Sequence, residues 1–344
     1  MGKYVIKRIT LAFVTTFIIL SITFILIKLL PFERPIGDDR AQTTYFDRQY
    51  NLGYVYRFDL PTDKYGELLY KSPSNKGKTS YYYMVPVMTQ YVNWLKNIVT
   101  EWDWGDSKTF QPNVKATVII MKRIGYSIRL NILSLISVPI GIMLGIWAAL
   151  KKNTATDHII STLVMVFISI PKFVLIIFLL QIFAYGLGWF PSTWPTDTAP
   201  LAERIRGYII PVFSLSFGSV CGYCRFVRAE LCDVLESDYL LLARTKGLTR
   251  RQAINRHALK NAMVPVFPAI VSEFIGILGG SMILEQLYGI PGIGKLFVLA
   301  MNYKDYDILF VDMAIFTTIS LLAGVLVDLS YGFIDPRIRM GAKK

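Results

Sequence analysis

The chain contains, from Ser237 to Pro265, the stretch SDYLLLARTKGLTRRQAINRHALKNAMVP, which is basic and lies between two strongly apolar segments. Ser237 or the aspartate after it can cap a first helix, and Gly247 ends that helix because glycine most easily adopts a left-handed C-terminal cap. Thr249 and Gln252 form the capping box of a second helix. Two short helices that meet at a glycine make a bent, rigid shape. At a membrane surface such a shape can fit a cleft on a soluble partner and transmit motion to the flanking helices.

The second helix is predicted to be amphipathic. One stripe holds Ala253, Ile254, His257, Ala258 and Asn261, and the basic side chains that face elsewhere are Arg250, Arg251, Arg256 and Lys260. The alternative interpretation is that this stretch is simply a positively charged cytoplasmic loop, as the positive-inside rule produces in any membrane protein.

The composition indicates a membrane protein. The 344 residues are 53% hydrophobic, and the mean hydropathy is +0.43, which is too apolar for an ordinary soluble domain. The formal net charge of +13 could suggest nucleic-acid binding. The basic residues lie beside apolar runs, however, and are not gathered on a soluble domain, so we interpret them as markers of membrane topology.

Six apolar segments are expected to cross the membrane. They are residues 9–30, 127–150, 158–187, 208–226, 263–287 and 308–334. Lysines and arginines precede the first span, so we place the N-terminus inside, and six spans return the C-terminus to the same side. We therefore expect a multi-pass protein of the cell (plasma or inner) membrane with both termini in the cytoplasm.

Residues 31–113 differ from the rest of the chain. They are polar and rich in tyrosine, and their ten lysines and arginines balance ten aspartates and glutamates. This neutrality fits an extracytoplasmic insert, either a small folded cap or a loosely ordered insertion. We expect three parts: a first transmembrane helix (1–30), this insert (31–113), and a five-helix core (114–344) that contains a cytoplasmic coupling segment (229–262).

Four ionisable residues within the apolar core are candidates for a translocation path: Lys172, Glu273, Glu285 and Asp312. Ionisable groups inside a membrane are costly unless they face protein or water. Lys172 follows Pro171 and could line a substrate path and attract a carboxylate. Equally, it could be the structural partner of Glu273, Glu285 or an acid of another subunit.

No residue is a candidate for catalysis or for metal binding. Cys221, Cys224 and Cys232 include a CxxC pair, but they lie in an apolar segment and the chain has only two histidines, so we expect buried packing residues. The segment from Gly289 to Leu296 nearly matches a phosphate loop. A leucine replaces the hydroxyl that binds magnesium, and no strand of an α/β unit precedes the segment, so we reject a nucleotide site.

Several motifs resemble those of one family. The chain contains Ala243-Arg-Thr-Lys-Gly-Leu248, Glu285-Gln-Leu-Tyr-Gly-Ile-Pro-Gly-Ile-Gly-Lys-Leu296, Lys304-Asp-Tyr306 and Asp335-Pro-Arg-Ile-Arg339. In this order they are similar to motifs of the permease subunits, of the B type, of oligopeptide and dipeptide importers of the ATP-binding-cassette class. The sequence departs from the pattern at Thr245, at Leu241 and Leu242 in the general family loop, and in the length of residues 33–80.

The resemblance implies a fold and a set of partners. The fold would be an all-α membrane protein with six transmembrane helices, the type I importer permease fold, with a small external insert between helices 1 and 2. The partners would be a second homologous permease subunit, two ATPase subunits, an external substrate-binding protein, the peptide substrate and the lipid bilayer, with no nucleic acid. The protein itself would be no enzyme and hold no cofactor, because the ATPases would bind ATP and Mg²⁺.

The resemblance also implies which residues couple to the ATPases. In this sequence they are Asp238, Tyr239, Ala243, Arg244, Lys246, Gly247, Leu248, Arg251, His257 and Asn261. Three alternatives remain open: an importer of the same family for metal chelates, glutathione or another small solute; an ion-coupled secondary transporter that uses Lys172, Glu273 and Asp312; and a membrane-embedded enzyme, which the scarcity of histidine disfavours.

Overall fold

The computed structural model describes residues 2–32, 34–73, 79–276 and 281–334. The chain forms two compact units: unit 1 comprises residues 1–9, 126–294 and 319–344, and unit 2 comprises residues 10–125 and 295–318. This division differs from the expected first helix, insert and five-helix core. The physical reason is an aromatic core that the first helix shares with the insert.

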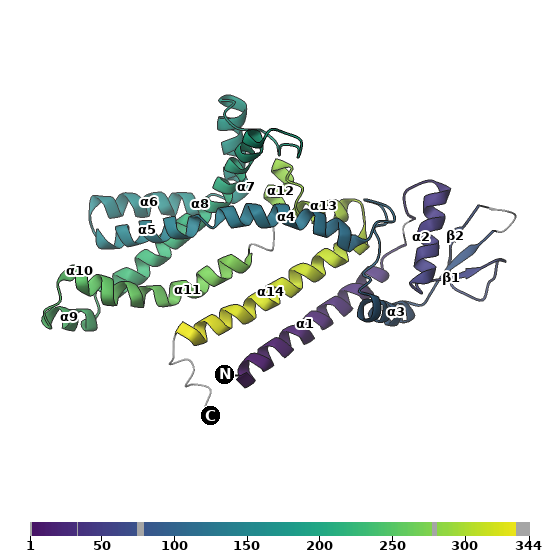
Figure 1. The fold of residues 1–344 in the computed structure, drawn as a ribbon, viewed down its shortest axis with the longest axis horizontal. Helices are drawn as coiled ribbons and strands as arrows, with labels where there is room; N and C mark the ends of the chain where they lie inside the picture. The colour runs from purple at the N-terminus through teal and green to yellow at the C-terminus, as the bar shows by residue number, and fades with distance from the viewer. Residues whose placement is uncertain (1, 33, 74–78, 277–280, 335–344) are drawn as a thin grey trace. The chain divides into compact units, whose positions relative to one another are not determined.

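The described residues are mostly helical, as expected, and their three strands all lie in the insert (Figure 1). The elements are α1 (Gly2–Lys28), α2 (Asp39–Asn51), β1 (Val55–Phe58), β2 (Leu68–Lys71), β3 (Tyr81–Met84), α3 (Val87–Glu101), α4 (Ala116–Ser134), α5 (Ser137–Leu150), α6 (Ala155–Ile168), α7 (Lys172–Leu179), the π-helix η1 (Leu180–Gly186), α8 (Leu201–Leu235), α9 (Asp238–Thr245), α10 (Arg250–Ala253), the π-helix η2 (Ile254–Ala258), α11 (Leu259–Gly276), α12 (Met282–Tyr288), α13 (Ile293–Asn302) and α14 (Tyr306–Ile334).

Four helical stretches among the described residues are long and apolar enough to cross a membrane, and the count reaches six if each of two bent helix pairs is one span. The four are Val5–Lys28, Ala116–Leu150, Leu201–Leu235 and Tyr306–Ser330. The upper count equals the expected number. One of its bent pairs, Met282–Tyr288 with Ile293–Asn302, overlaps the expected fifth span (263–287) only at the end of that span, and α11 is not among the stretches counted. Part of the expected fifth span (277–280) and the motif at 335–339 lie outside the described residues.

The expected third span is sharply bent. Its two halves, Ala155–Ile168 and Lys172–Gly186, meet at 98°. Pro171 occupies the N-cap of α7 with an extended ψ of 140°. Proline has no N–H to continue the hydrogen-bond ladder of α6, so the helix ends and a new one starts in another direction.

Helix α8 is the centre of unit 1. Helices α5 and α6 lie beside it (Figure 1), and α5 presents Gly141 and Gly145, four residues apart, to α8. A β-carbon at Gly141 would lie 2.7 Å from Val220 O, and one at Gly145 would lie 2.7 Å from Cys224 O. Glycine therefore lets the backbones of α5 and α8 approach closely. The three cysteines of α8 are free and buried.

A buried ion pair fixes α6 to α8. Asp157 is fully buried. Its carboxylate accepts hydrogen bonds from Arg228 Nε at 2.5 Å and Nη2 at 2.8 Å, and from Ser161 Oγ and the backbone N–H of Asn153. The buried charge is thus both paired and hydrogen-bonded, which is the condition for retaining it in an apolar interior.

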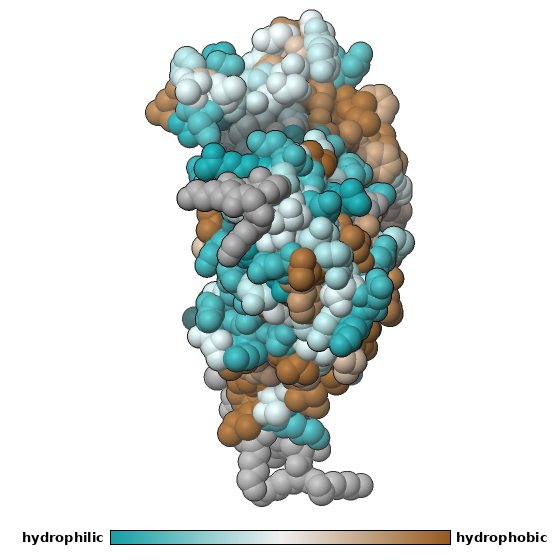
Figure 2. Space-filling view, turned by 90° about the vertical axis from the view of Figure 1, so that its right-hand side faces the viewer, coloured by the Kyte–Doolittle hydropathy of each residue, from teal (hydrophilic) through white to brown (hydrophobic). Residues whose placement is uncertain are grey.

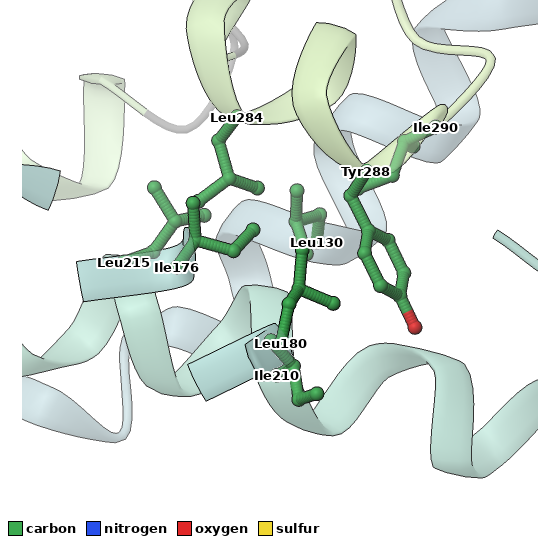
Figure 3. Close-up of a cluster of buried hydrophobic side chains, with 8 residues drawn as sticks. All are labelled: Leu130, Ile176, Leu180, Ile210, Leu215, Leu284, Tyr288 and Ile290. Atoms are coloured by element: carbon green, nitrogen blue, oxygen red, sulfur yellow. The ribbon is translucent and has the colours of Figure 1, made fainter. Parts of the chain in front are cut away.

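Figure 3 shows the apolar cluster at the other end of α8. Its members come from α4, α7, η1, α8, α12 and the turn after α12: Leu130, Ile176, Leu180, Ile210, Leu215, Leu284, Tyr288 and Ile290. The hydroxyl of Tyr288 points away from the cluster and donates to Pro191 O at 3.0 Å. The ring of Tyr288 therefore packs among apolar side chains, while its hydroxyl has a hydrogen-bond partner.

The glycine-proline motif after α12 surrounds the carboxylate of Glu285. This side chain is fully buried, and its Oε1 accepts from Ser127 Oγ at 2.7 Å and from the backbone N–H of Ser281 at 3.2 Å. Ser127 Oγ in turn accepts from the backbone N–H of Ile293 at 2.9 Å. A β-carbon at Gly292 would overlap both Glu285 Oε2 and Ser127 Oγ. The motif is thus a tight backbone turn around a buried carboxylate.

Unit 2 contains a small antiparallel sheet in the order β1-β3-β2, which the sequence analysis did not predict. Val55 pairs with Met84 and Phe58 with Tyr81. Helix α2 packs on this sheet through an aromatic core in which Phe46 stacks on Tyr70, with ring centroids 4.7 Å apart. The insert is therefore the folded cap rather than the loosely ordered insertion.

A second aromatic cluster joins α1 to the insert within unit 2. Phe24 stacks on Trp94 at 4.8 Å between centroids, and both belong to a buried cluster with Tyr54 and Phe310. Lys28 lies over the Tyr54 ring, 4.8 Å from its centroid. The end of α1 is thus part of the insert's core, which is why the two form one unit.

Asp305, in the Lys304-Asp-Tyr306 motif, binds the distant segment that begins at Ser107. Its Oδ2 accepts from Ser107 Oγ at 2.7 Å and from the backbone N–H groups of Lys108, Thr109 and Phe110 at 3.1, 2.9 and 2.9 Å. The carboxylate therefore closes the turn that begins at Ser107.

Figure 2 looks onto the part of unit 2 that carries α2, β1 and β2, and this face is mostly hydrophilic. A hydrophilic face fits a cap that is in contact with water.

The Glu285 turn predicts a specific effect of added volume. Gly292→Ala should lower stability by roughly 1–3 kcal/mol, because the new methyl group overlaps a buried carboxylate and a buried hydroxyl. The measurement is the melting temperature of the purified protein. Gly324→Ala is the matched control, because a β-carbon there meets nothing within 4 Å. Equal melting temperatures for the two variants would contradict the described turn.

The ion pair between α6 and α8 predicts a second effect. Asp157→Ala should destabilise the protein by about 1–3 kcal/mol, because the Arg228 side chain, which is 31% exposed, loses its charge-assisted hydrogen bonds to α6. Lys152→Gln removes the exposed ion pair of Lys152 with Glu236 and should change the melting temperature little. A loss as small for Asp157→Ala as for Lys152→Gln would show that the buried pair does not hold α6 in place.

Candidate functional site

The coupling segment forms the two predicted short helices. Ser237 is the N-cap of α9 by backbone geometry, although its hydroxyl donates to Val234 O instead of capping. Gly247 has φ +95°, the left-handed conformation expected at the end of the first helix. The capping box between Thr249 and Gln252 is present in both directions. The bent pair of helices is therefore confirmed.

The predicted stripe on the second helix is wrong at two positions. Ala253, Ile254 and Ala258 are buried, but His257 and Asn261 are exposed. The cause is η2, in which hydrogen bonds span five residues instead of four. The extra residue rotates the following face by one position, so Ala262 is buried where a regular α-helix would bury Asn261.

An apolar cluster holds the coupling segment to unit 1. Leu240 is the buried residue of α9. It shares a buried cluster with residues of α5, α8, α10, η2 and α11: Ala149, Leu231, Cys232, Ala253, Ile254, Ala258 and Ala262. Ala243 and Leu248 are half-buried. The other implied coupling residues form the exposed side of the segment: Asp238, Tyr239, Arg244, Lys246, Gly247, Arg251, His257 and Asn261.

The exposed side has both apolar and cationic character. Tyr239, Leu241 and Leu242 are 41%, 60% and 55% exposed. Arg244 and Arg250 line a groove of about 360 Å³ between α9 and α10, together with Asp238 and Leu241. Apolar side chains that are left exposed beside cationic ones are typical of a protein contact surface.

The largest cavity described in unit 1 has a volume of about 560 Å³. It is lined by residues of α4, α7, α8 and α11 and of the segments that follow α4 and precede α12: Asn131, Ser134, Leu135, Lys172, Leu215, Ser219, Gly222, Tyr223, Phe226, Ala269, Ser272, Glu273, Gly276 and Ser281. Hydroxyl groups and one amide make up much of its polar lining. Such a volume and lining suit a small polar ligand.

The four path candidates lie in different local environments. Lys172 and Glu273 line the cavity. Glu285 is buried in its own backbone turn, and Asp312 is fully buried on α14 within unit 2. Neither of these two contributes to the cavity lining. Within unit 1, Glu285 is therefore not brought together with Lys172 and Glu273.

Sequence reasoning missed the polar residues that complete the cavity. Ser219 Oγ donates to Glu273 Oε1 at 2.8 Å, and Tyr223 Oη donates to Ala269 O at 3.0 Å. The signal was present in α8, because Leu215, Ser219 and Gly222 recur at helical spacing and so share one face. Small and hydroxyl-bearing residues on one face of an apolar helix could have indicated a water-filled wall.

The two sites lie on the same pair of helices. The coupling segment begins at the end of α8 and continues directly into α11. Five lining residues of the cavity belong to α8, and four belong to α11. The coupling segment therefore connects two walls of the cavity.

Comparisons with known proteins identify the family. The family model of the binding-protein-dependent transport system inner membrane component matches residues 141–340, more than half of the chain. The chain is 31% identical over 345 residues to the dipeptide transport system permease protein DppB of Bacillus subtilis (strain 168), and the match covers 100% of both chains. It is 31% identical over 351 residues to the oligopeptide transport system permease protein OppB of Salmonella typhimurium, with 98% of this chain and 100% of the relative covered.

A solved structure of an amino acid ABC transporter with histidines matches 62% of this chain and 94% of that chain, with 19% identity and a TM-score of 0.47. The family model and the full-length relatives, in contrast, are decisive. The chain belongs to the family of inner membrane components of binding-protein-dependent transport systems, and it is a multi-pass membrane permease.

Proposed function

We propose that this permease is half of the translocation pathway of an ATP-driven importer of dipeptides or oligopeptides. The proposal that the substrate is a peptide rests on the names of relatives that align over nearly the whole chain. The pathway itself is proposed to run through the cavity of unit 1, with Lys172 and Glu273 in its wall. A second, homologous permease supplies the other half.

The observation that carries the proposal is the connection between the coupling segment and the cavity. An ATPase that displaces α9 and α10 acts on Leu240 and its cluster, and hence on the ends of both α8 and α11. Because these helices also line the cavity, their movement alters its walls. A rigid-body movement of packed helices needs no further element to transmit it.

The energy comes from partner subunits. Two ATPases bind ATP and Mg²⁺, dock on the exposed side of α9 and α10, and change their separation during hydrolysis. Cationic side chains such as Arg244 and Lys246 give the contact its orientation, while Tyr239 and Leu241 supply apolar area. An external binding protein delivers the peptide on the side of the membrane that carries the insert, and both termini lie in the cytoplasm.

The test is reconstitution of this chain in liposomes with its second permease, the two ATPases and the binding protein. The proposal requires uptake of peptide that depends on ATP and stops when the ATPases are omitted. Uptake that persists without ATPases and follows an ion gradient would instead indicate a secondary transporter.

The left-handed backbone conformation of Gly247 predicts an effect of substitution on uptake. Gly247→Val should reduce uptake about tenfold or more, because a β-branched residue at φ +95° costs more than the ~1–2 kcal/mol that an ordinary residue pays there. Gly247→Asn is the matched control, because asparagine tolerates this conformation. Uptake assays at equal amounts of membrane-inserted protein make the comparison. Full activity of the valine variant would contradict a role for the bend.

The cationic side of the coupling segment predicts an effect of charge reversal on ATPase binding. The double variant Arg244→Glu, Lys246→Glu should no longer co-purify with the ATPases, because the charge reversal repels the partner surface. Lys64→Glu with Lys96→Glu makes the same charge change on exposed residues of the insert and should leave co-purification unchanged. If both double variants retain the ATPases, the docking surface lies elsewhere.

A further inference from the structure

The cavity of unit 1 carries two opposite charges that do not neutralise each other. Lys172 at the start of α7 and Glu273 on α11 both line it. Among the residues that the structure describes, the ammonium group of Lys172 forms neither a hydrogen bond nor an ion pair. Glu273 is engaged only by Ser219, which donates to Oε1 at 2.8 Å. The structural interpretation of Lys172, as the ion-pair partner of Glu273 or Glu285, therefore finds no support.

The position of Lys172 keeps its ammonium group in the cavity. Its stem lies along α8 at Gly218, where a β-carbon would be in van der Waals contact with Lys172 Cε at 3.6 Å. Glu273 is half-buried and lies on α11, another wall of the same cavity. Separate charges in a membrane interior are costly unless water or a ligand compensates them. A solute that carries one charge of each sign compensates both at once.

The remaining lining suits a peptide backbone of varied sequence. Asn131, Ser134, Ser219 and Ser272 offer donors and acceptors, and Leu215 and Phe226 offer apolar surface. A volume of about 560 Å³ is large enough for a short peptide segment. The charges of Lys172 and Glu273 are the features of this lining that can distinguish one solute from another.

We infer that this cavity recognises the zwitterionic character of the solute, with Lys172 binding the free carboxylate and Glu273 binding the free ammonium group. The inference rests on the proposed peptide import and adds the chemical requirement that both peptide termini be charged. In the low dielectric of the membrane interior each contact is stronger than in water. A peptide that lacks one terminal charge leaves one of the two side chains uncompensated.

The test measures how two substitutions change the uptake of two blocked peptides by the reconstituted importer. Uptake of one tripeptide with free termini is compared with uptake of its C-terminal amide and of its N-acetyl form. The three solutes are given to the wild type, to Lys172→Gln and to Glu273→Gln. Because the same binding protein delivers the solutes to every variant, its own selectivity cancels in the ratios.

We expect a crossed pattern. In Lys172→Gln the preference for the free peptide over the amide should fall about tenfold, while the preference over the N-acetyl form remains. In Glu273→Gln the preference for the free peptide over the N-acetyl form should fall about tenfold, while the preference for the free peptide over the amide should remain. Lys172→Arg and Glu273→Asp, which keep the charges, should retain both preferences.

The outcomes separate the inference from the proposed function. If the wild type imports the free peptide but each substitution lowers the uptake of all three solutes by the same factor, the two charges are structural and the inference is overturned while peptide import stands. If the wild type complex imports no peptide, both the proposed function and the inference are overturned. Unchanged preferences in both glutamine variants would also overturn the inference.

Discussion

The burial of Leu240 is the contact on which the account depends. This side chain is 4% exposed and packs in one cluster with residues of α5, α8, α10, η2 and α11. Removing a buried leucine from such a cluster costs about 2–5 kcal/mol. The coupling segment is therefore attached firmly to the helices that it connects, and a force on its exposed side moves the ends of α8 and α11 rather than only a loop.

Three buried carboxylates of the described residues share one feature. Asp157, Glu285 and Asp305 are all buried, and each carboxylate receives several hydrogen bonds from side chains and backbone N–H groups. An unsatisfied charge in an apolar interior is too costly to retain. Lys172 and Glu273 differ from these residues because they face a cavity. This contrast is why we propose a structural role for the three buried carboxylates and a ligand-binding role for Lys172 and Glu273.

The sequence predicted the elements whose signals are local. The bend at Gly247 and the capping box at Thr249 need only their own neighbours, and both are confirmed. The exposure of His257 and Asn261 was not predictable, because η2 breaks the regular helical period from which faces are read. The sheet was also missed, since each strand has only four residues and Tyr81 to Met84 show no alternation of apolar and polar residues. Glu285 was assigned to the path because a sequence does not show that Ser127, distant in the chain, binds its carboxylate.

The most direct test of the central claim measures the cavity wall itself during the ATPase cycle. In the intact importer, with the native cysteines replaced, spin labels at Ser272 on α11 and Ser134 on α4 report the distance between two walls of the cavity. The account predicts that nucleotide binding to the ATPases shifts this distance by more than the width of either distribution, and that no shift occurs without the ATPases. Identical distributions with and without nucleotide, in a complex that hydrolyses ATP and imports solute, would contradict the claim.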